Sequence, residues 1–222
     1  MPRKTFDDEL RELREGFDKM GELIESALTG CIESFKKADM DIALEVSKND
    51  KLINAMEHEL QSKTLTLILR QQPVAGDLRE ISTILRAVTD LERIGDQAAD
   101  ISESVLNFAK KKRCIYSERF NKIAEKSVNI VKLCIRAFVE RDTKLSTQVI
   151  EMDDEIDMLF NSIKEEIIAA IKQDGSEYDE LDMYVDLLMI AKHFEKIGDH
   201  AVNIAEWTKF RETGILQNDR LI

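Results

Sequence analysis

The sequence contains few of the residues that build tight turns and β-sheet cores. Its 222 residues include 8 glycines, 2 prolines and 6% aromatic residues, so a typical β-sandwich is disfavoured. The 3 cysteines, Cys31, Cys114 and Cys134, form no C-x-x-C pair, which argues against a disulfide framework and a thiolate zinc site. Apolar runs reach only five residues and the first ten residues carry three acids, so we expect no membrane-spanning segment and no secretion signal. These absences favour long helices and a cytoplasmic protein.

The charge is one-sided, with 44 acidic residues against 32 basic residues and a formal net charge of −12. A chain of this sign repels the phosphate backbone of nucleic acids, so we expect no nucleic-acid partner. Cations and basic protein surfaces are better partners. The 43% of hydrophobic residues is enough to bury a globular core.

Apolar residues recur at three- and four-residue steps and predict six long amphipathic helices. The first begins just after Thr5, and Asp39 or Asp41 is placed to cap the second. Gln72-Pro73 breaks the pattern after the second helix. The expected helices end near Ala38, Leu69 and Lys111 in the first half and span about 117–140, 142–172 and 178–210 in the second.

The second half of the chain repeats the first. With a fixed offset of 103 residues, 17 of the 77 aligned pairs from Cys31 to Asn107 are identical, and 7 of them fall in the 12 positions that start at Glu92. We therefore predict an all-α fold made by tandem duplication of a three-helix bundle, with repeats at residues 1–114 and 115–222. The periodicity does not tell whether the bundles lie side by side or end to end.

Acidic residues recur at equivalent places in both halves. At 100° per residue, Glu92 and Asp96 share one helical face opposite the apolar stripe, and Glu195 and Asp199 do the same. The second helix of each half carries a companion pair, in which Asn54 replaces the second acid of the first half. The candidate metal ligands are therefore Asp50, Glu92 and Asp96 in the first half and Asp153, Asp157, Glu195 and Asp199 in the second.

Like charges four residues apart destabilise a helix unless a cation offsets their repulsion. Carboxylates without thiolates favour hard or borderline cations such as Mg²⁺, Mn²⁺ or Fe³⁺, and several acids together can hold more than one ion. A solvated acidic face that binds nothing specific explains one isolated pair as well. The recurrence of Glu-x-x-x-Asp in both halves leaves these two interpretations evenly matched.

Two further residue types near the acids have uncertain roles. Gly95 and Gly198 interrupt strong helical patterns, and each provides either a packing notch between helices or clearance for a ligand. His193 and His200 share a face that points away from the neighbouring acids, so we interpret them as boundary residues rather than co-ligands.

Most enzyme classes lack the residues that they need. The sequence has no phosphate-binding glycine motif, no H-E-x-x-H zinc motif and no Glu-x-x-His pair for a di-iron core, and it offers no nucleophile with a base. We expect a protein without catalytic activity. The alternatives are a carboxylate-bridged metal hydrolase or oxidase, and a structural bundle with no specific metal.

The segments Glu92-Arg-Ile-Gly-Asp96 and Glu195-Lys-Ile-Gly-Asp199, inside a duplicated three-helix unit, resemble the PhoU family of phosphate-transport accessory and regulatory proteins. The resemblance covers about Phe17 to Phe210. It implies a cytosolic, often dimeric, negative regulator of the phosphate-starvation response. Such a protein links the ATPase subunit of the phosphate ABC transporter to a sensor histidine kinase, and reaches the membrane only through these partners.

The resemblance also implies multinuclear metal clusters at Glu/Asp-x-x-x-Asp motifs on the bundle surface. These motifs match both acidic pairs of the third helices, and the companion motif matches Asp153 and Asp157. Iron and zinc are the metals implied by the family, while the carboxylate ligands also suit manganese or magnesium. Because Asn54 follows Asp50, the first site has one carboxylate fewer, and its full occupancy stays open.

Overall fold

The computed structural model describes residues 2–109, 117–174 and 178–215, and these residues form helices without any strand. The all-α duplication predicted from the sequence is confirmed. The predicted boundary between the repeats, at residues 114 and 115, lies outside the described residues. The six helices are α1 (Pro2–Lys37), α2 (Met40–Gln71), α3 (Ala75–Ala109), α4 (Glu118–Glu140), α5 (Thr143–Asp174) and α6 (Tyr178–Thr213).

Matching caps begin the second helix of each repeat. The Asp39 carboxylate accepts hydrogen bonds from two amides of the first turn of α2 at 3.0 and 3.1 Å, and Asp142 accepts two at 2.9 Å from α5. The residues just before these caps, Ala38 and Arg141, have positive φ angles of 51° and 59°. The chain therefore makes the same sharp reversal in both repeats, and Asp39 rather than Asp41 is the cap.

The first helix begins earlier than the sequence suggested. It starts at Pro2, three residues before Thr5, because proline fits the first turn of a helix, where its missing N–H loses no hydrogen bond. The last residues of the expected third helix, Lys110 and Lys111, lie outside the described residues. Only helix ends differ, and the helical faces stay as predicted.

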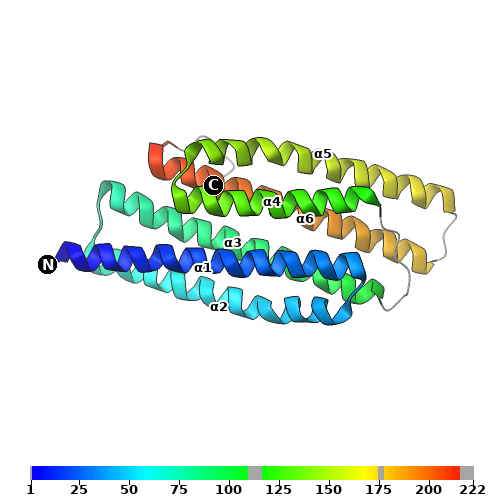
Figure 1. Cartoon of the computed structure of the whole chain (residues 1–222), viewed down its shortest axis with the longest axis horizontal. Coiled ribbons are helices and arrows are strands. Elements are labelled where there is room, and N and C mark those ends of the chain that lie inside the picture. The colour runs from blue at the N-terminus through cyan, green and yellow to red at the C-terminus, as the bar shows by residue number, and fades with distance from the viewer. Residues whose placement is uncertain (1, 110–116, 175–177, 216–222) are drawn as a thin grey trace.

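The two bundles lie side by side in an elongated molecule, which answers the question that periodicity left open (Figure 1). α1 contacts α4, and α3 contacts α6. Phe17 stacks on Phe138 with ring centroids 4.1 Å apart, while Phe35 and Phe120 are 5.6 Å apart. The offset of 103 residues exchanges these two pairs, so the repeats are related by an approximate twofold axis. The third helices, which carry the acidic motifs, therefore meet at the centre of the molecule.

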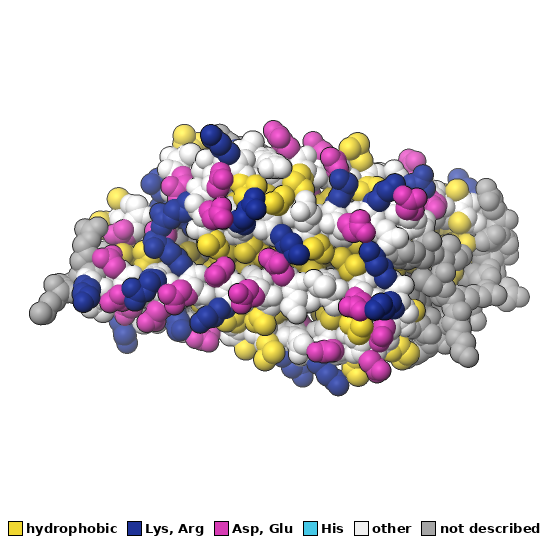
Figure 2. Space-filling model, in the orientation of Figure 1, with side chains coloured by type: hydrophobic (Ala, Val, Ile, Leu, Met, Phe, Trp, Pro, Cys, Tyr) yellow, Lys and Arg dark blue, Asp and Glu magenta, His cyan; other side chains and the backbone are white. Residues whose placement is uncertain are grey.

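The core is continuous across both bundles. Aliphatic and aromatic side chains from all six helices are buried in it, and burying one of these larger side chains stabilises the fold by about 2 kcal/mol. Figure 2 shows apolar side chains along the boundary between the bundles and charged side chains of both signs over each bundle. Cys31 and Cys134 are buried and unpaired. Among the described residues, no helix is long and apolar enough to cross a membrane.

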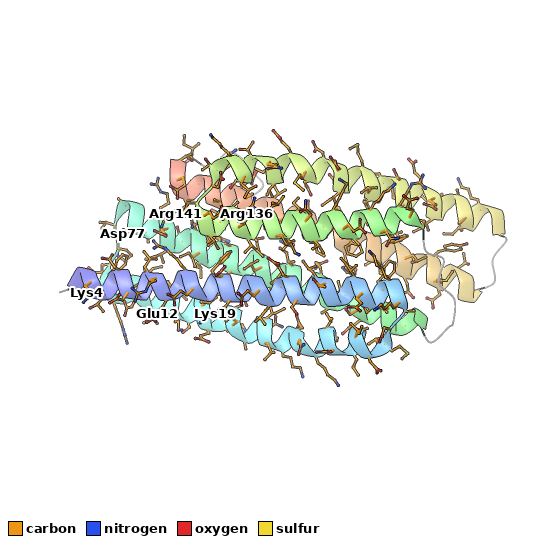
Figure 3. All side chains as sticks on the ribbon, viewed as in Figure 1. Lys4, Glu12, Lys19, Asp77, Arg136 and Arg141 are labelled. Atoms are coloured by element: carbon orange, nitrogen blue, oxygen red, sulfur yellow. The ribbon has the colours of Figure 1, made fainter. Side chains whose placement is uncertain are left out.

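An ionic cluster joins the two repeats at one end of the molecule. Glu80 of α3, whose side chain is 10% exposed, accepts hydrogen bonds from Arg14 of α1 at 2.7 Å and from Arg141, the residue that follows α4, at 2.5 Å. Figure 3 shows Arg141 at the end of α4, close to the start of α3. Nearby, buried Arg211 donates to a backbone carbonyl of α4 at 2.5 Å. The residue equivalent to Glu80 in the second repeat is Met183, which is buried in the core, so this ionic link has no counterpart there.

Candidate metal centres

The second repeat brings its four predicted ligands together. α5 and α6 pack side by side, and Asp153 and Asp157 of α5 face Glu195 and Asp199 of α6 across an open hollow of about 500 Å³. The remaining residues of the hollow are Lys196, His200, Val202, Asn203 and Glu206. Because α6 presents Glu195, Asp199 and Asn203 at successive turns, one face of the helix forms the wall of the hollow.

Burial and mutual repulsion raise the pKa values of these acids. The pKa of Asp153 rises from 3.8 to about 7, first because the carboxyl is buried and then because Asp157, Asp199 and Glu195 repel its charge. The pKa of Asp157 rises for the same reasons, with Glu195 and Asp199 as the repelling groups. The oxygen Oδ1 of Asp153 is buried without a hydrogen-bond partner among the described residues. A bound cation would remove both the repulsion and this unsatisfied acceptor.

The two glycines of the motifs have different neighbours. A Cβ atom at Gly198 would collide with Oδ1 of Asp153, so a side chain here would displace a candidate ligand. A Cβ atom at Gly95 would instead meet Ile24 and Ile53 at 3.1 Å. Gly95 is therefore a packing notch, whereas Gly198 also gives clearance to the site. The sequence alone left both explanations open for each glycine.

The first repeat brings its three predicted ligands together in the same way. The pKa of Asp50 on α2 is raised by burial and then by repulsion from Asp96 on α3, and that of Glu92 is raised by burial and then by Asp96. Asn54 donates from Nδ2 to Asp50 at 2.9 Å. Oδ1 of Asp50 and Oδ1 of Asn54 are buried without a hydrogen-bond partner among the described residues. The amide therefore offers a neutral oxygen where the second repeat has a carboxylate.

Basic side chains of the same helices hold the motif acids. Arg93 pairs with Asp96 at 3.0 Å, Lys192 with Glu195 at 2.7 Å, and Lys196 with Asp199. In this arrangement no three His, Cys, Asp or Glu side chains of residues 2–109, 117–174 and 178–215 converge at metal-ligand spacing. Cation binding therefore requires the acids to rotate away from these partners. The donors are all oxygens, which fits hard cations such as Mg²⁺, Mn²⁺ and Fe³⁺.

The motif glutamates are less exposed than a solvent-facing stripe predicts. The Glu92 side chain is 13% exposed and that of Glu195 is 12% exposed, because the neighbouring helices α2 and α5 cover them. Sequence reasoning also missed Lys196 and Asn203 as residues of the second hollow. The sequence did contain a signal for them, because residues three before and four after Asp199 lie on the same helical face as Asp199.

The histidines lie between the repeats, as expected of boundary residues. His193 donates from Nδ1 to Gln97 at 2.8 Å, and His200 donates from Nδ1 to Asp90 at 2.9 Å. Both bonds cross from α6 to α3. His200 also lines the second hollow, while its Nδ1 is engaged by Asp90.

The duplicated unit of this chain matches a known protein family. The PhoU domain family matches residues 17–105 and, a second time, residues 120–208. A phosphate-specific transport system accessory protein PhoU homolog from Clostridium acetobutylicum is 35% identical over 216 residues, which are 96% of this chain and 97% of the relative. A homolog of the same name from Aquifex aeolicus is 33% identical and covers 85% of this chain and 84% of the relative.

Solved structures agree with this relationship over nearly the whole chain. The crystal structure of PhoU from Pseudomonas aeruginosa matches with a TM-score of 0.90 and 27% identity, covering 95% of this chain and 100% of that chain. The phosphate transport system regulatory protein PhoU from Streptococcus pneumoniae matches with a TM-score of 0.88 and 26% identity, covering 96% and 99%. The duplicated domain, the fold and the full-length relatives together establish that the chain belongs to the PhoU family.

Proposed function

We propose that this protein is an accessory protein of phosphate-specific transport and a cytoplasmic negative regulator of the phosphate-starvation response. Two observations support this role. Its relatives named as phosphate-specific transport accessory proteins align with it over nearly their whole length. The described residues also contain no segment able to span a membrane.

The finer proposal is a metal-binding adaptor. It contacts the ATPase subunit of the phosphate ABC transporter and a sensor histidine kinase, and it forms a homodimer. The observation that carries the metal part is the second hollow, where four carboxylates repel one another and an oxygen of Asp153 has no hydrogen-bond partner among the described residues. Cations there would fix the acids and reduce the negative charge of the face.

The role proposed is not catalytic. The second hollow is lined by five acids, a lysine, a valine, an amide and a histidine, with no hydroxyl or thiol nucleophile placed beside a base. A hydrolase or oxidase of the carboxylate-bridged type would show turnover of a phosphate ester or consumption of oxygen by the metal-loaded protein. We expect neither reaction.

The regulatory proposal is tested by deletion of the gene in its host. We expect phosphate-starvation genes to be expressed in high phosphate, and the wild-type gene to restore repression. An unchanged response in the deletion strain would contradict the proposal. The adaptor step is tested separately by measuring binding of the purified protein to the transporter ATPase subunit and to the cytoplasmic part of the kinase.

The metal proposal is tested on protein purified without chelators. We expect stoichiometric metal in the wild type, with less in Glu92→Ala/Asp96→Ala and in Glu195→Ala/Asp199→Ala. Metal retained in both double variants would refute the assignment of the sites. Weak binding that disappears at moderate salt would favour the structural bundle instead.

A further inference from the structure

The motif-bearing helices α3 and α6 contact each other through polar side chains. On one side of the contact, Oδ1 of Asp90 accepts two hydrogen bonds from α6, from Nδ1 of His200 at 2.9 Å and from Nδ2 of Asn203 at 3.0 Å. The side chains of Asp90 and His200 are only 14% and 22% exposed. Water therefore competes little for these bonds.

On the other side of the contact, the donor is again a histidine of α6. His193 of α6 donates from Nδ1 to Oε1 of Gln97 at 2.8 Å, and the same nitrogen lies 3.7 Å from a carboxylate oxygen of Asp100. The offset of 103 residues converts Asp90, Gln97 and Asp100 into His193, His200 and Asn203. We call these six residues, Asp90, Gln97 and Asp100 of α3 with His193, His200 and Asn203 of α6, the seam. The two halves of the seam are therefore equivalent under the approximate twofold axis of the molecule.

Each half of the seam joins the two acidic motifs. Gln97 directly follows Asp96, and His200 directly follows Asp199. Asp90 lies two residues before Glu92 on α3. A side chain next to each candidate site is thus hydrogen-bonded to the helix segment that carries the other site.

We infer that Asp90 and Gln97 are positioning residues that couple the two candidate cation sites, so that filling one site orders the helix segment of the other and strengthens its binding. This inference rests on the proposed metal binding. Ordering of one segment lowers the entropy that the second binding event must remove, which makes the coupling positive.

Direct electrostatic coupling between the sites would have the opposite sign, because two bound cations repel. The acids that raise the pKa of Asp50 all belong to the first repeat, and those that raise the pKa of Asp153 all belong to the second. Charge therefore acts mainly within each site. The hydrogen bonds of the seam provide the contact between them.

The experiment is a Mn²⁺ titration of chelator-stripped, full-length protein, followed by electron paramagnetic resonance. The affinity of the second site is measured in the wild type and in Glu92→Ala/Asp96→Ala. We expect the second site to bind about fivefold more weakly when the first is deleted. The same comparison in an Asp90→Ala/Gln97→Leu background should give equal affinities.

Two variants separate positioning from general packing. Asp90→Asn keeps an acceptor oxygen for His200 and should retain the fivefold coupling. Arg86→Ala removes a contact with Trp207 across the same two helices, 5.9 Å from guanidinium to ring, but outside the seam, and should also retain it. If the combined seam variant does not fold by circular dichroism, Asp90→Ala and Gln97→Leu are tested singly, and each should reduce the coupling.

The outcomes distinguish this inference from the proposal beneath it. Absence of specific Mn²⁺ binding in the wild type overturns the metal function and the coupling together. Binding at both sites with no change on deletion of the first overturns the coupling alone. The coupling alone is also overturned if the fivefold effect persists in the folded seam variants, or if the effect is lost in Asp90→Asn.

Discussion

The two repeats use the same motif helix and different partner helices. Glu-x-x-Gly-Asp is unchanged on α3 and α6, but the second helix supplies Asp153 and Asp157 in one repeat and Asp50 and Asn54 in the other. Each motif thus keeps its acids while its neighbour changes the charge of the site. Duplication therefore preserved the geometry of the acidic motifs and allowed the charge of their partner residues to diverge.

The repeats also differ in how they are held together. Glu80 binds two arginines of other helices at one end, whereas its equivalent Met183 is part of the core at the other. The repeats are therefore joined by a nearly buried ionic cluster at one end, and at the other by core packing together with the exposed pair of Lys36 and Glu125.

The largest expected effect tests this difference between the ends. Glu80→Met, which places the residue of the second repeat in the first, should lower the free energy of unfolding by about 3 kcal/mol because it removes the nearly buried acceptor of two charge-assisted hydrogen bonds. Met183→Leu, a change of similar volume, should lower it by about 1 kcal/mol or less. Urea denaturation measures both, and equal effects would contradict the asymmetry.

The next effect is a pH dependence in the second repeat. Because the pKa of Asp153 is raised from 3.8 to about 7, the folded protein holds this proton more tightly than the unfolded chain. Metal-stripped wild type should therefore lose stability as the pH rises from about 4 to about 7.

Asp153→Asn removes that loss and tests its origin. The free energy of unfolding of the variant minus that of the wild type should be about 2 kcal/mol larger at pH 8 than at pH 4. This value is already reduced because solvent screens the charge of this partly exposed group. Asp50→Asn in the first repeat should gain less. Thermal unfolding of both proteins across this pH range measures the gain. A gain in stability that does not depend on pH would exclude the titration of Asp153 as its cause.

Exchanging the companion residues at positions 54 and 157 tests whether their charge sets the affinity of each site. Asn54→Asp should tighten Mn²⁺ binding by the first repeat about tenfold, and Asp157→Asn should weaken binding by the second about tenfold, since affinity follows the number of charged ligands. Isothermal titration calorimetry on each variant measures the change. Identical affinities before and after the exchange would show that the companion acids are not ligands.

The smallest expected effect concerns the glycines. Gly198→Ala should weaken Mn²⁺ binding by the second repeat about fivefold, because its Cβ displaces Asp153, while Gly95→Ala should change binding by the first less than about twofold. Each alanine also gains up to about 1 kcal/mol of helix propensity. The same titrations provide the measurement, and equal losses would contradict the different roles of the two glycines.

The helices and their faces could be predicted from the sequence because their signals are local. The three- and four-residue spacing of apolar side chains and the caps Asp39 and Asp142 act within one or two turns. The fixed offset of 103 residues then predicted the duplication without any structure. Only helix ends, such as Pro2, were misplaced, since a first turn has few contacts to define it.

The arrangement of the bundles and the environment of the acids could not be predicted in the same way. The side-by-side packing depends on contacts such as Phe17 with Phe138, which are far apart in the chain. The burial of Glu92 and Glu195 depends on how closely α2 and α5 approach, and helical projection contains no such distance. The different neighbours of Gly95 and Gly198 have the same origin.

Anomalous scattering from crystals grown in Mn²⁺ tests most directly whether the duplicated acids hold cations. Anomalous difference maps should show peaks beside Asp153, Glu195 and Asp199, with weaker peaks beside Asp50, Glu92 and Asp96. Maps without a peak at either place, from crystals in which basic side chains still pair with the acids, would contradict the account.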